Sequence, residues 1–202
     1  MVAQGGASGP LLVATRNEHK LRELEQMLGG RRLEPLPDAV QLPPEDGETF
    51  ADNALLKARA AHLATDRAAV ADDSGIEASG LGGEPGVRSA RYAGEDASDG
   101  QNLEKLLREV GTAAGGREVA YVCVLAYVNE AGEEGTFEGR CEGILAEQPR
   151  GSGGFGYDPA FLPAEVGDGR TMAELSPQEK NAISHRGRAA RLLAAHLAGR
   201  AL

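Results

Sequence analysis

The chain has 202 residues, of which 41% are hydrophobic, and its 31 acidic and 21 basic residues give a net charge of −10. This length suits one domain with a sizeable core. The excess of carboxylates disfavours a nucleic-acid partner, because a phosphate backbone would be repelled. A small polyphosphate can still bind where a few cations and a metal ion gather in one cleft.

The composition predicts a cytoplasmic protein without a membrane segment. Residues 1–10 are rich in Gly, Ala and Ser and have no basic start, which predicts a flexible N-terminal extension ahead of a single domain at 11–202. No segment approaches the length that spans a bilayer. Cys123 and Cys141 lack CxxC spacing and lie in apolar or strand-like surroundings, so we expect reduced, buried thiols.

Apolar periodicity predicts strands that alternate with helices. Leucines recur at helical spacing between residues 18 and 28, and Thr49 with Asp52 resembles a capping box. In chain order we expect a strand at 11–15, a helix at about 18–28 stopped by Gly29-Gly30, a Pro-rich connection, a helix at about 49–64, a strand at 68–71, a helix at 98–110, a hairpin of 119–128 with 136–146, and a helical C-terminal region. This order predicts an α/β protein with a mixed sheet.

The first candidate site is the run Thr15-Arg16-Asn17-Glu18-His19-Lys20, where a strand leads into a helix. Unpaired N–H groups and the helix dipole favour an anion at such a point. Asn17 and Lys20 are three residues apart and share a face, which suits phosphate oxygens. A plain capped helix with a surface lysine has the same residues, and the glycines of a Walker loop are absent.

Two adjacent carboxylates follow the strand at 68–71, in Asp72-Asp73-Ser74-Gly75. We expect them at the C-terminal edge of the sheet, where open α/β proteins bind ligands. Neighbouring side chains on a strand point to opposite faces, so one carboxylate should face the cleft and the other support it, unless the chain has already turned. Carboxylates suit Mg²⁺ and can accept a proton from water. An ordinary turn remains the alternative here, as it does for the acidic loop Glu45-Asp46-Gly47.

Glycines flank two aromatic residues in Gly153-Gly154-Phe155-Gly156-Tyr157-Asp158-Pro159. Glycine lets the backbone approach a ligand closely, and an exposed ring of Phe155 or Tyr157 offers a stacking surface. The alternative is a loop whose two rings close the edge of the core. The GxGxxG spacing over residues 151–156 does not indicate a dinucleotide site, because no apolar helix follows it.

The C-terminal region predicts a helix that breaks. Ser176-Pro177-Gln178-Glu179 is a helix start with Pro at the first helical position. On one continuous helix Lys180 and His185 would point about 140° apart. Joint contact of both with a ligand therefore requires a break, for which Ser184 is a natural second N-cap. The alternative for His185 and Arg186 is a solvated helix face.

Taken together, these motifs closely resemble the inosine triphosphate pyrophosphatase family, the non-canonical purine nucleoside triphosphate pyrophosphatases. The motifs, in family order, are Thr15-x-Asn17-x-x-Lys20, Ala71-Asp72-Asp73-Ser74-Gly75, Pro85 to Tyr92, Gly153 to Pro159 and Ser184-His185-Arg186-Gly187. The resemblance covers roughly residues 11–197. It departs before Leu11 and in the Pro-rich stretch 31–44, which bears on the metal ligand expected near Glu45.

The resemblance implies an elongated α/β fold with a central mixed, twisted sheet flanked by helices, two lobes with the active site in the cleft between them, and a homodimer. It implies Mg²⁺-dependent conversion of ITP, dITP or XTP to the monophosphate and pyrophosphate. By the same resemblance, Asp73 binds the metal with Glu45 and activates water, with support from Asp72 and Ser74. The implied substrate contacts are Thr15, Arg16, Asn17, Glu18, His19 and Lys20 at the triphosphate motif with Lys57 nearby, Phe155 stacked on the base, Gly156, Tyr157 and Asp158 around its pocket, and Lys180, His185 and Arg186 completing the base and phosphate contacts.

Selectivity for hypoxanthine and xanthine has a physical basis in hydrogen bonding. Both bases present a keto oxygen where adenine has an amino group, so donors from His185 and Arg186 would favour them. Guanine shares this keto group, and its rejection must arise around its 2-amino group.

Two alternatives remain at the level of the sequence. A Maf-like pyrophosphatase of related architecture would act on different nucleotides, and a nucleotide-binding regulator would bind without turnover. The pair Asp72 and Asp73 argues against the regulator, because an anion site gains nothing from carboxylates unless a metal intervenes.

Overall fold

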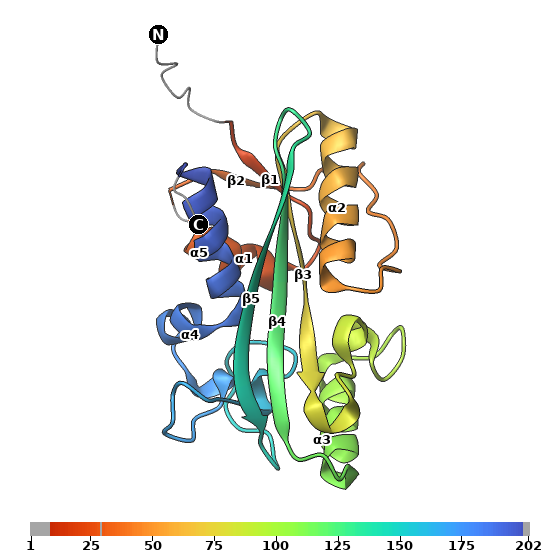
Figure 1. Cartoon of the computed structure of the whole chain (residues 1–202), viewed down its shortest axis with the longest axis vertical. Coiled ribbons are helices and arrows are strands. Elements are labelled where there is room, and N and C mark those ends of the chain that lie inside the picture. Colours follow the sequence, from red (N-terminus) through yellow and green to blue (C-terminus); the bar gives the residue numbers. More distant parts are fainter. Residues whose placement is uncertain (1–8, 29, 200–202) are drawn as a thin grey trace.

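The computed structural model describes residues 9–28 and 30–199, and these contain a mixed six-stranded sheet in the order β2-β1-β3-β4-β5-β6 (Figure 1). The strands are β1 (Leu11–Val13), β2 (Leu33–Pro35), β3 (Ala69–Ala78), β4 (Glu118–Val128), β5 (Glu134–Leu145) and β6 (Phe161–Pro163). The helices are α1 (Glu18–Met27), α2 (Phe50–Thr65), α3 (Asp99–Thr112), α4 (Pro177–Ile183) and α5 (His185–Leu197). The expected α/β class with a mixed sheet flanked by helices is confirmed. Gly29 and most of the expected N-terminal extension lie outside the described residues.

Alternation along β3 and β4 sends successive side chains to opposite faces of the sheet. On one face, Val70 and Leu125 pack with side chains of α1 and α5. On the other face, Ala71 and Val124 pack with the alanines of α2. A third cluster, around Ile76, joins the far end of the sheet to α3, so that the long strands run through the whole molecule (Figure 1).

Strand β3 is paired along both edges over only part of its length. Its antiparallel ladder with β4 covers the whole strand, whereas its parallel ladder with β1 stops at Val70. The reason is that β1 ends at Val13 and the chain then turns into α1. Residues 71–74 therefore have no strand partner on the β1 side within the described residues and leave this edge open. From Gly75 onward, residues 84–89 cover the edge, through the bridge between Glu77 and Pro85 and the hydrogen bond from the amide of Ile76 to the hydroxyl of Ser89. A ligand at this edge can reach both faces of the sheet.

The structure corrects the expected end of β3. The sequence predicts a strand that stops before Asp72, but β3 continues to Ala78, so Asp72 and Asp73 lie within the strand and not at the C-terminal edge of the sheet. Two adjacent carboxylates are typical of a turn, yet here cations from helices on both faces compensate them, as described below. The first strand is shorter than expected, ending at Val13, and the short strands β2 and β6 were not predicted.

The predicted helix starts and the predicted break are confirmed. Thr49 and Ser176 each cap a helix in a capping box, as their sequence patterns indicate, and Ser98, for which no cap was predicted, does the same. Ser184 ends α4 and caps α5 by accepting a hydrogen bond from the amide of Gly187. The hairpin of β4 and β5 is also present. No helix within residues 9–28 and 30–199 is both long and apolar enough to cross a membrane.

Helix α5 lies in close contact with β5 at Gly139. A Cβ atom at this position would overlap the carbonyl oxygen of His185 and lie 2.6 Å from the amide nitrogen of Ala189. The absence of a side chain on Gly139 therefore sets the distance between α5 and the sheet. It also sets the position of Arg186, one residue into the helix.

We expect Gly139→Ala to lower the free energy of unfolding by about 2 kcal/mol, because α5 must move away from the sheet to make room for a methyl group. Gly111→Ala in α3 is the matched control. Its Cβ would meet its nearest neighbour, Nη1 of Arg117, only at 3.9 Å, and alanine is the better helix former by about 0.8–1 kcal/mol in a helix interior. Urea unfolding measures both variants, and equal stabilities would contradict the close packing at Gly139.

Candidate active site

Asp72 and Asp73 point to opposite faces of β3, as strand alternation predicts. Both are buried, with 1% and 5% of their surfaces exposed. Asp72 faces α1 and α5, whereas Asp73 faces α2. Because a buried carboxylate is costly without a partner, each face must supply its own cations.

The carboxylate of Asp72 joins α1 to α5. Nε of Arg186 donates to Oδ2 at 2.8 Å, Lys20 forms an ion pair with Oδ1, and the hydroxyl of Ser74 donates to Oδ1 at 3.0 Å. The thiol of Cys123 lies 3.0 Å from Oδ2. Burial opposes ionisation, but Arg186 and Lys20 outweigh it and hold the pKa of Asp72 well below its ordinary value.

A second carboxylate, that of Glu23, extends this network and was not predicted. It accepts hydrogen bonds from Nζ of Lys180 at 2.7 Å and from Nη1 of Arg186 at 2.5 Å. Burial raises the pKa of Glu23, but the two cations lower it by more, so that the net shift of this pKa is downward. The one local signal is its spacing, three residues after Lys20 on the same face of α1.

On the α2 face, one ammonium serves two carboxylates. Nζ of Lys57 lies 3.2 Å from Oδ1 of Asp73 and also pairs with Glu45. Asn53, which was not predicted, donates to Oδ2 of Asp73 at 3.2 Å. Burial raises the pKa of Asp73 in spite of Lys57. Arg91 donates to the backbone carbonyl of Glu45 at 2.8 Å and so holds this loop against the site.

Glu45 and Asp73 fit a magnesium ion that is shared with a substrate. Mg²⁺ usually takes one or two protein carboxylates and completes its shell with phosphates and water. Within the described residues no group of three or more His, Cys, Asp or Glu side chains is placed to hold a metal ion. The donor set therefore suits an ion that arrives with phosphate ligands and not a closed structural site.

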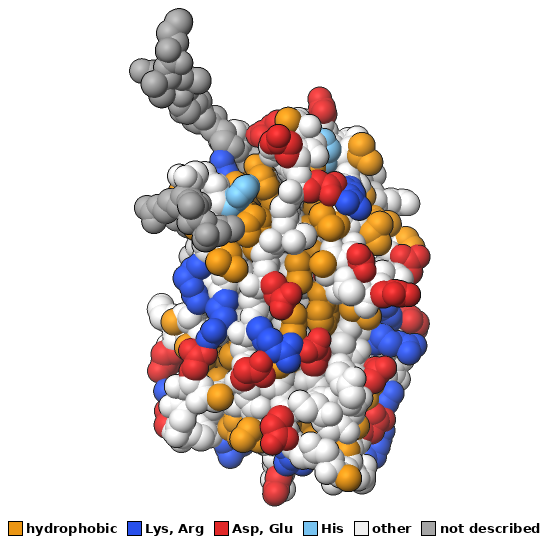
Figure 2. All heavy atoms as spheres, in the orientation of Figure 1, with side chains coloured by type: hydrophobic (Ala, Val, Ile, Leu, Met, Phe, Trp, Pro, Cys, Tyr) orange, Lys and Arg blue, Asp and Glu red, His pale blue; other side chains and the backbone are white. Residues whose placement is uncertain are grey.

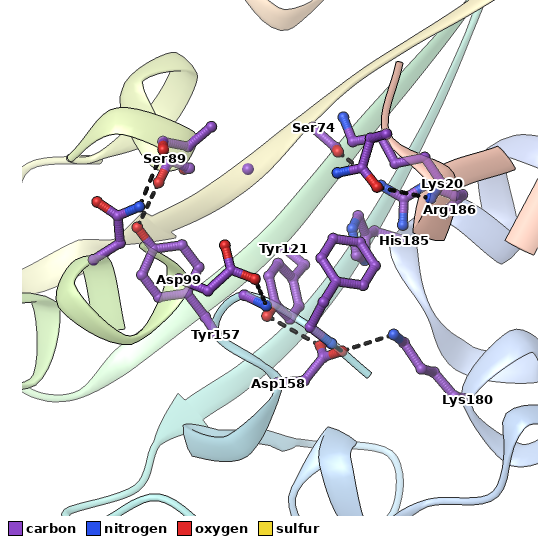
Figure 3. Close-up of a pocket in the computed structure, with 16 residues that line it drawn as sticks. Lys20, Ser74, Ser89, Asp99, Tyr121, Tyr157, Asp158, Lys180, His185 and Arg186 are labelled. Carbon is purple, nitrogen blue, oxygen red and sulfur yellow. Dashed lines mark hydrogen bonds and ion pairs between the residues drawn. The ribbon is translucent and has the colours of Figure 1, made fainter. Parts of the chain in front are cut away.

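A cavity of about 120 Å³ lies at the open edge of β3, on the side of α1 and α5 (Figure 3). Its walls come from segments far apart in the sequence. The predicted residues that line it are Asn17, Lys20, Ser74, Phe155, Gly156, Tyr157, Asp158, Lys180, His185 and Arg186.

Asp158 holds the aromatic loop of residues 153–159 in place. Its Oδ2 accepts hydrogen bonds from the amide of Phe155 at 2.9 Å and from Nζ of Lys180 at 2.7 Å. Its Oδ1 accepts one from the hydroxyl of Tyr121 at 3.1 Å. The loop is thus tied to both α4 and β4, and Figure 3 shows these side chains converging below the cavity.

The two rings of this loop have different surroundings. Phe155 is half-buried, with Nζ of Lys180 5.1 Å and Cζ of Arg186 5.7 Å from its centroid, and it stacks on His19 at 5.2 Å. The expectation of an exposed Tyr157 is wrong. That ring is 5% exposed, because its hydroxyl reaches inward and donates to a backbone carbonyl at 2.7 Å. Of the two rings of this loop, Phe155 is therefore the one that keeps exposed surface at the cavity.

His185 and Arg186 enter the cavity from the first turn of α5. His185 stacks on Tyr121 at 4.5 Å, and its Nδ1 has no hydrogen-bond partner within the described residues. Burial and nearby cations hold the pKa of His185 well below its ordinary value, so the ring is neutral. Arg186 uses three N–H groups on Asp72, Glu23 and Ser74. A guanidinium has five such donors, so two remain.

Four residues of the predicted triphosphate motif lie outside the cavity lining, namely Thr15, Arg16, Glu18 and His19. The guanidinium of Arg16 donates to the carbonyls of Leu36 and Pro37 at 2.9 Å, and it thereby ties the Pro-rich segment to the start of α1. The side chain of Glu18 is 81% exposed and pairs with Arg22 one turn later.

The start of α1 is already capped in this structure. Oδ1 of Asn17 accepts hydrogen bonds from the amides of His19 and Lys20 at 2.9 and 3.2 Å, and Oγ1 of Thr15 accepts one from the amide of Asn17. The expectation of unpaired N–H groups at this point is therefore not met for three amides. Lys20, and not the helix terminus, is the group of this motif that carries positive charge to the cavity.

We expect Asp72→Asn to destabilise the protein by about 3 kcal/mol at pH 7, because it leaves the buried Arg186 and the partly buried Lys20 without their shared anion. The folded-state pKa of Asp72 is depressed, so its contribution is present above the unfolded value of 3.8 and is lost as the pH falls through the folded value. The deficit of the variant should therefore shrink in acid. Urea unfolding at pH 7 and pH 3 measures it, with Asp38→Asn, at a fully exposed carboxylate, as the control. A deficit that does not depend on pH would contradict the charge-based account.

Comparison with known proteins places this fold and site in a family. The model of the Ham1 family matches residues 11–196. A dITP/XTP pyrophosphatase of Geobacter sulfurreducens is 48% identical, covering 93% of this chain and 96% of the relative, and one of Mycobacterium bovis is 50% identical over 91% and 92%. The Ham1 protein structure of Staphylococcus aureus superposes with a TM-score of 0.84 at 38% identity, over 94% of this chain and 98% of that one. The resemblance found in the motifs is confirmed, and the chain belongs to the Ham1 family.

Proposed function

We propose that this protein hydrolyses non-canonical purine nucleoside triphosphates, namely ITP, dITP and XTP, to the monophosphate and pyrophosphate. The observation that carries the proposal is the course of β3. Its open edge lies between a base-sized cavity on one face and the group of Glu45, Lys57 and Asp73 on the other. Relatives that match nearly the whole chain are named dITP/XTP pyrophosphatases, which supports the same activity.

The chain's own residues supply binding and proton transfer. The base stacks on Phe155, and the neutral His185 and a free N–H group of Arg186 donate to its keto oxygen. Lys20 and Lys57 attract the phosphates across the edge of β3. Asp73 accepts a proton from the attacking water, as a carboxylate can when it acts as a general base.

Mg²⁺ is the cofactor that this proposal includes, held by Glu45 and Asp73. When bound, it supplies charge neutralisation to the phosphates and polarises their oxygens.

The remaining parts of the proposal are a homodimeric, cytoplasmic protein without a nucleic-acid or membrane partner. The face in Figure 2 intermingles acidic and basic side chains, in keeping with a small-molecule substrate. Membership of the Ham1 family disfavours the Maf-like alternative.

The bond that is cleaved provides the first test. Anchoring of the phosphate tail near Lys20, with Asp73 beside the water, places the attack at the α-phosphorus. We expect stoichiometric pyrophosphate from ITP, and in ¹⁸O-labelled water we expect the label in IMP. Stoichiometric orthophosphate from a phosphatase-free preparation would contradict the proposal.

Replacement of Asp73 provides the second test. Asp73→Asn keeps the volume and the contact to Asn53 but removes the proton acceptor and a metal ligand, so we expect kcat for ITP to fall by roughly 10²-fold or more. Asp66→Asn is the control, since Asp66 is a left-handed C-cap of α2 and asparagine tolerates that conformation. Thermal melting checks that both variants fold. Near-parental turnover of a folded Asp73→Asn protein would assign the role to another group, and binding without turnover in the parent would support the regulator.

A further inference from the structure

Rejection of guanine requires a feature of the pocket near position 2 of the base. Xanthine and guanine carry the same 6-keto group and differ at position 2, where xanthine has an oxygen and guanine has an amino group. An amino group is a donor and needs an acceptor when it is buried. A carboxylate oxygen open to the base would therefore favour guanine and repel xanthine.

Asp158 is the carboxylate that could offer such an acceptor. It lines the cavity and is 3% exposed. Its Oδ2 is occupied by Lys180 and by the amide of Phe155, two contacts that hold the loop. Oδ1 then supplies the remaining acceptor sites of this carboxylate, and one of its two sites is used by the hydroxyl of Tyr121, which donates to it at 3.1 Å.

The hydroxyl of Tyr121 is held in that position. Its ring lies between His185 and Phe161, with centroids 4.5 and 4.4 Å away and interplanar angles of 14° and 26°. Rotation out of this stack would disturb both neighbours. Burial, with the charge of Asp158, raises the pKa of Tyr121 well above its ordinary value, so the group stays protonated and remains a donor.

We propose that Tyr121 is a specificity-determining residue, which disfavours guanine by donating its hydroxyl to Oδ1 of Asp158 and so occupying an acceptor site that the 2-amino group would otherwise use. This inference rests on the proposed function, since it takes a purine base to occupy this cavity. Tyr121 acts through Asp158 and is in that sense a positioning residue. It accounts for discrimination at position 2, whereas His185 and Arg186 act at position 6.

The test is Tyr121→Phe, which removes the hydroxyl and keeps the ring. Freed Oδ1 should favour GTP and disfavour XTP, so we expect the ratio of kcat/KM for XTP to that for GTP to fall by about tenfold or more, as for one hydrogen bond to a charged group. The ratio for ITP to ATP, which reports on position 6, should stay within about twofold of the parent. Tyr127→Phe is the matched control, because Tyr127 lies on the same strand and face but packs in the core near His196, 6.0 Å away.

A purely structural role for the hydroxyl would weaken all four nucleotides alike. That result, or XTP-to-GTP ratios that are equal in Tyr121→Phe and Tyr127→Phe, would overturn the proposal, and so would a shift confined to the ITP-to-ATP ratio. If Tyr121→Phe fails to fold by thermal melting, Tyr121→Leu also lacks the hydroxyl and must shift the ratio in the same direction.

Failure of the proposed function has a different signature. It would appear in the parent, as no release of pyrophosphate from ITP or XTP. The affinities of XMP and GMP, measured by calorimetry without turnover, then still decide the role of Tyr121. In Tyr121→Phe, GMP should bind more tightly relative to XMP than it does in the parent. An unchanged ratio of the two dissociation constants would overturn the inference.

Discussion

Two buried charges side by side on one strand constrain the whole of this structure. Asp72 and Asp73 are adjacent in β3 and nearly inaccessible to solvent, and strand geometry sends them to opposite faces. Leaving either without a partner would cost several kcal/mol. Each face must therefore carry a helix that places a cation at this level of the sheet. Arg186 meets this requirement on one face, and Lys57 meets it on the other.

The position of the helices follows from this requirement, and the position of the site follows from the helices. Lys20 and Arg186 bring the starts of α1 and α5 to the same carboxylate, and Glu23 links Arg186 onward to Lys180. The cavity walls are thus held by the ion pairs that make the burial of Asp72 tolerable. Groups fixed in this way before a ligand arrives need little reorganisation, which is the condition for electrostatic catalysis.

Local patterns in the sequence predicted local structure correctly, but they failed where contacts between residues far apart in the sequence determine the structure. The helix starts and the break at Ser184 could be predicted, because a capping box involves only four residues. The length of β3 could not, since Asp72 is compensated by Arg186, 114 positions away. The role of Glu23 could not be predicted for the same reason. In the sequence it is one of many acidic residues, and only its contact with Lys180, 157 positions away, sets it apart. The motif resemblance supplied most of the cavity lining, but not the capped state of the start of α1.

The balance of charge in the site bears on its need for a metal. On the side of the cavity, three cations meet three carboxylates, namely Lys20, Lys180 and Arg186 with Glu23, Asp72 and Asp158. On the other face, Lys57 and Arg91 meet Glu45 and Asp73. Neither group carries net positive charge, yet a triphosphate brings several negative charges into it. The substrate must either displace carboxylates from their cations or arrive with a cation of its own, and a divalent ion at Glu45 and Asp73 meets this need without breaking the pairs around Asp72 that hold the helices in place.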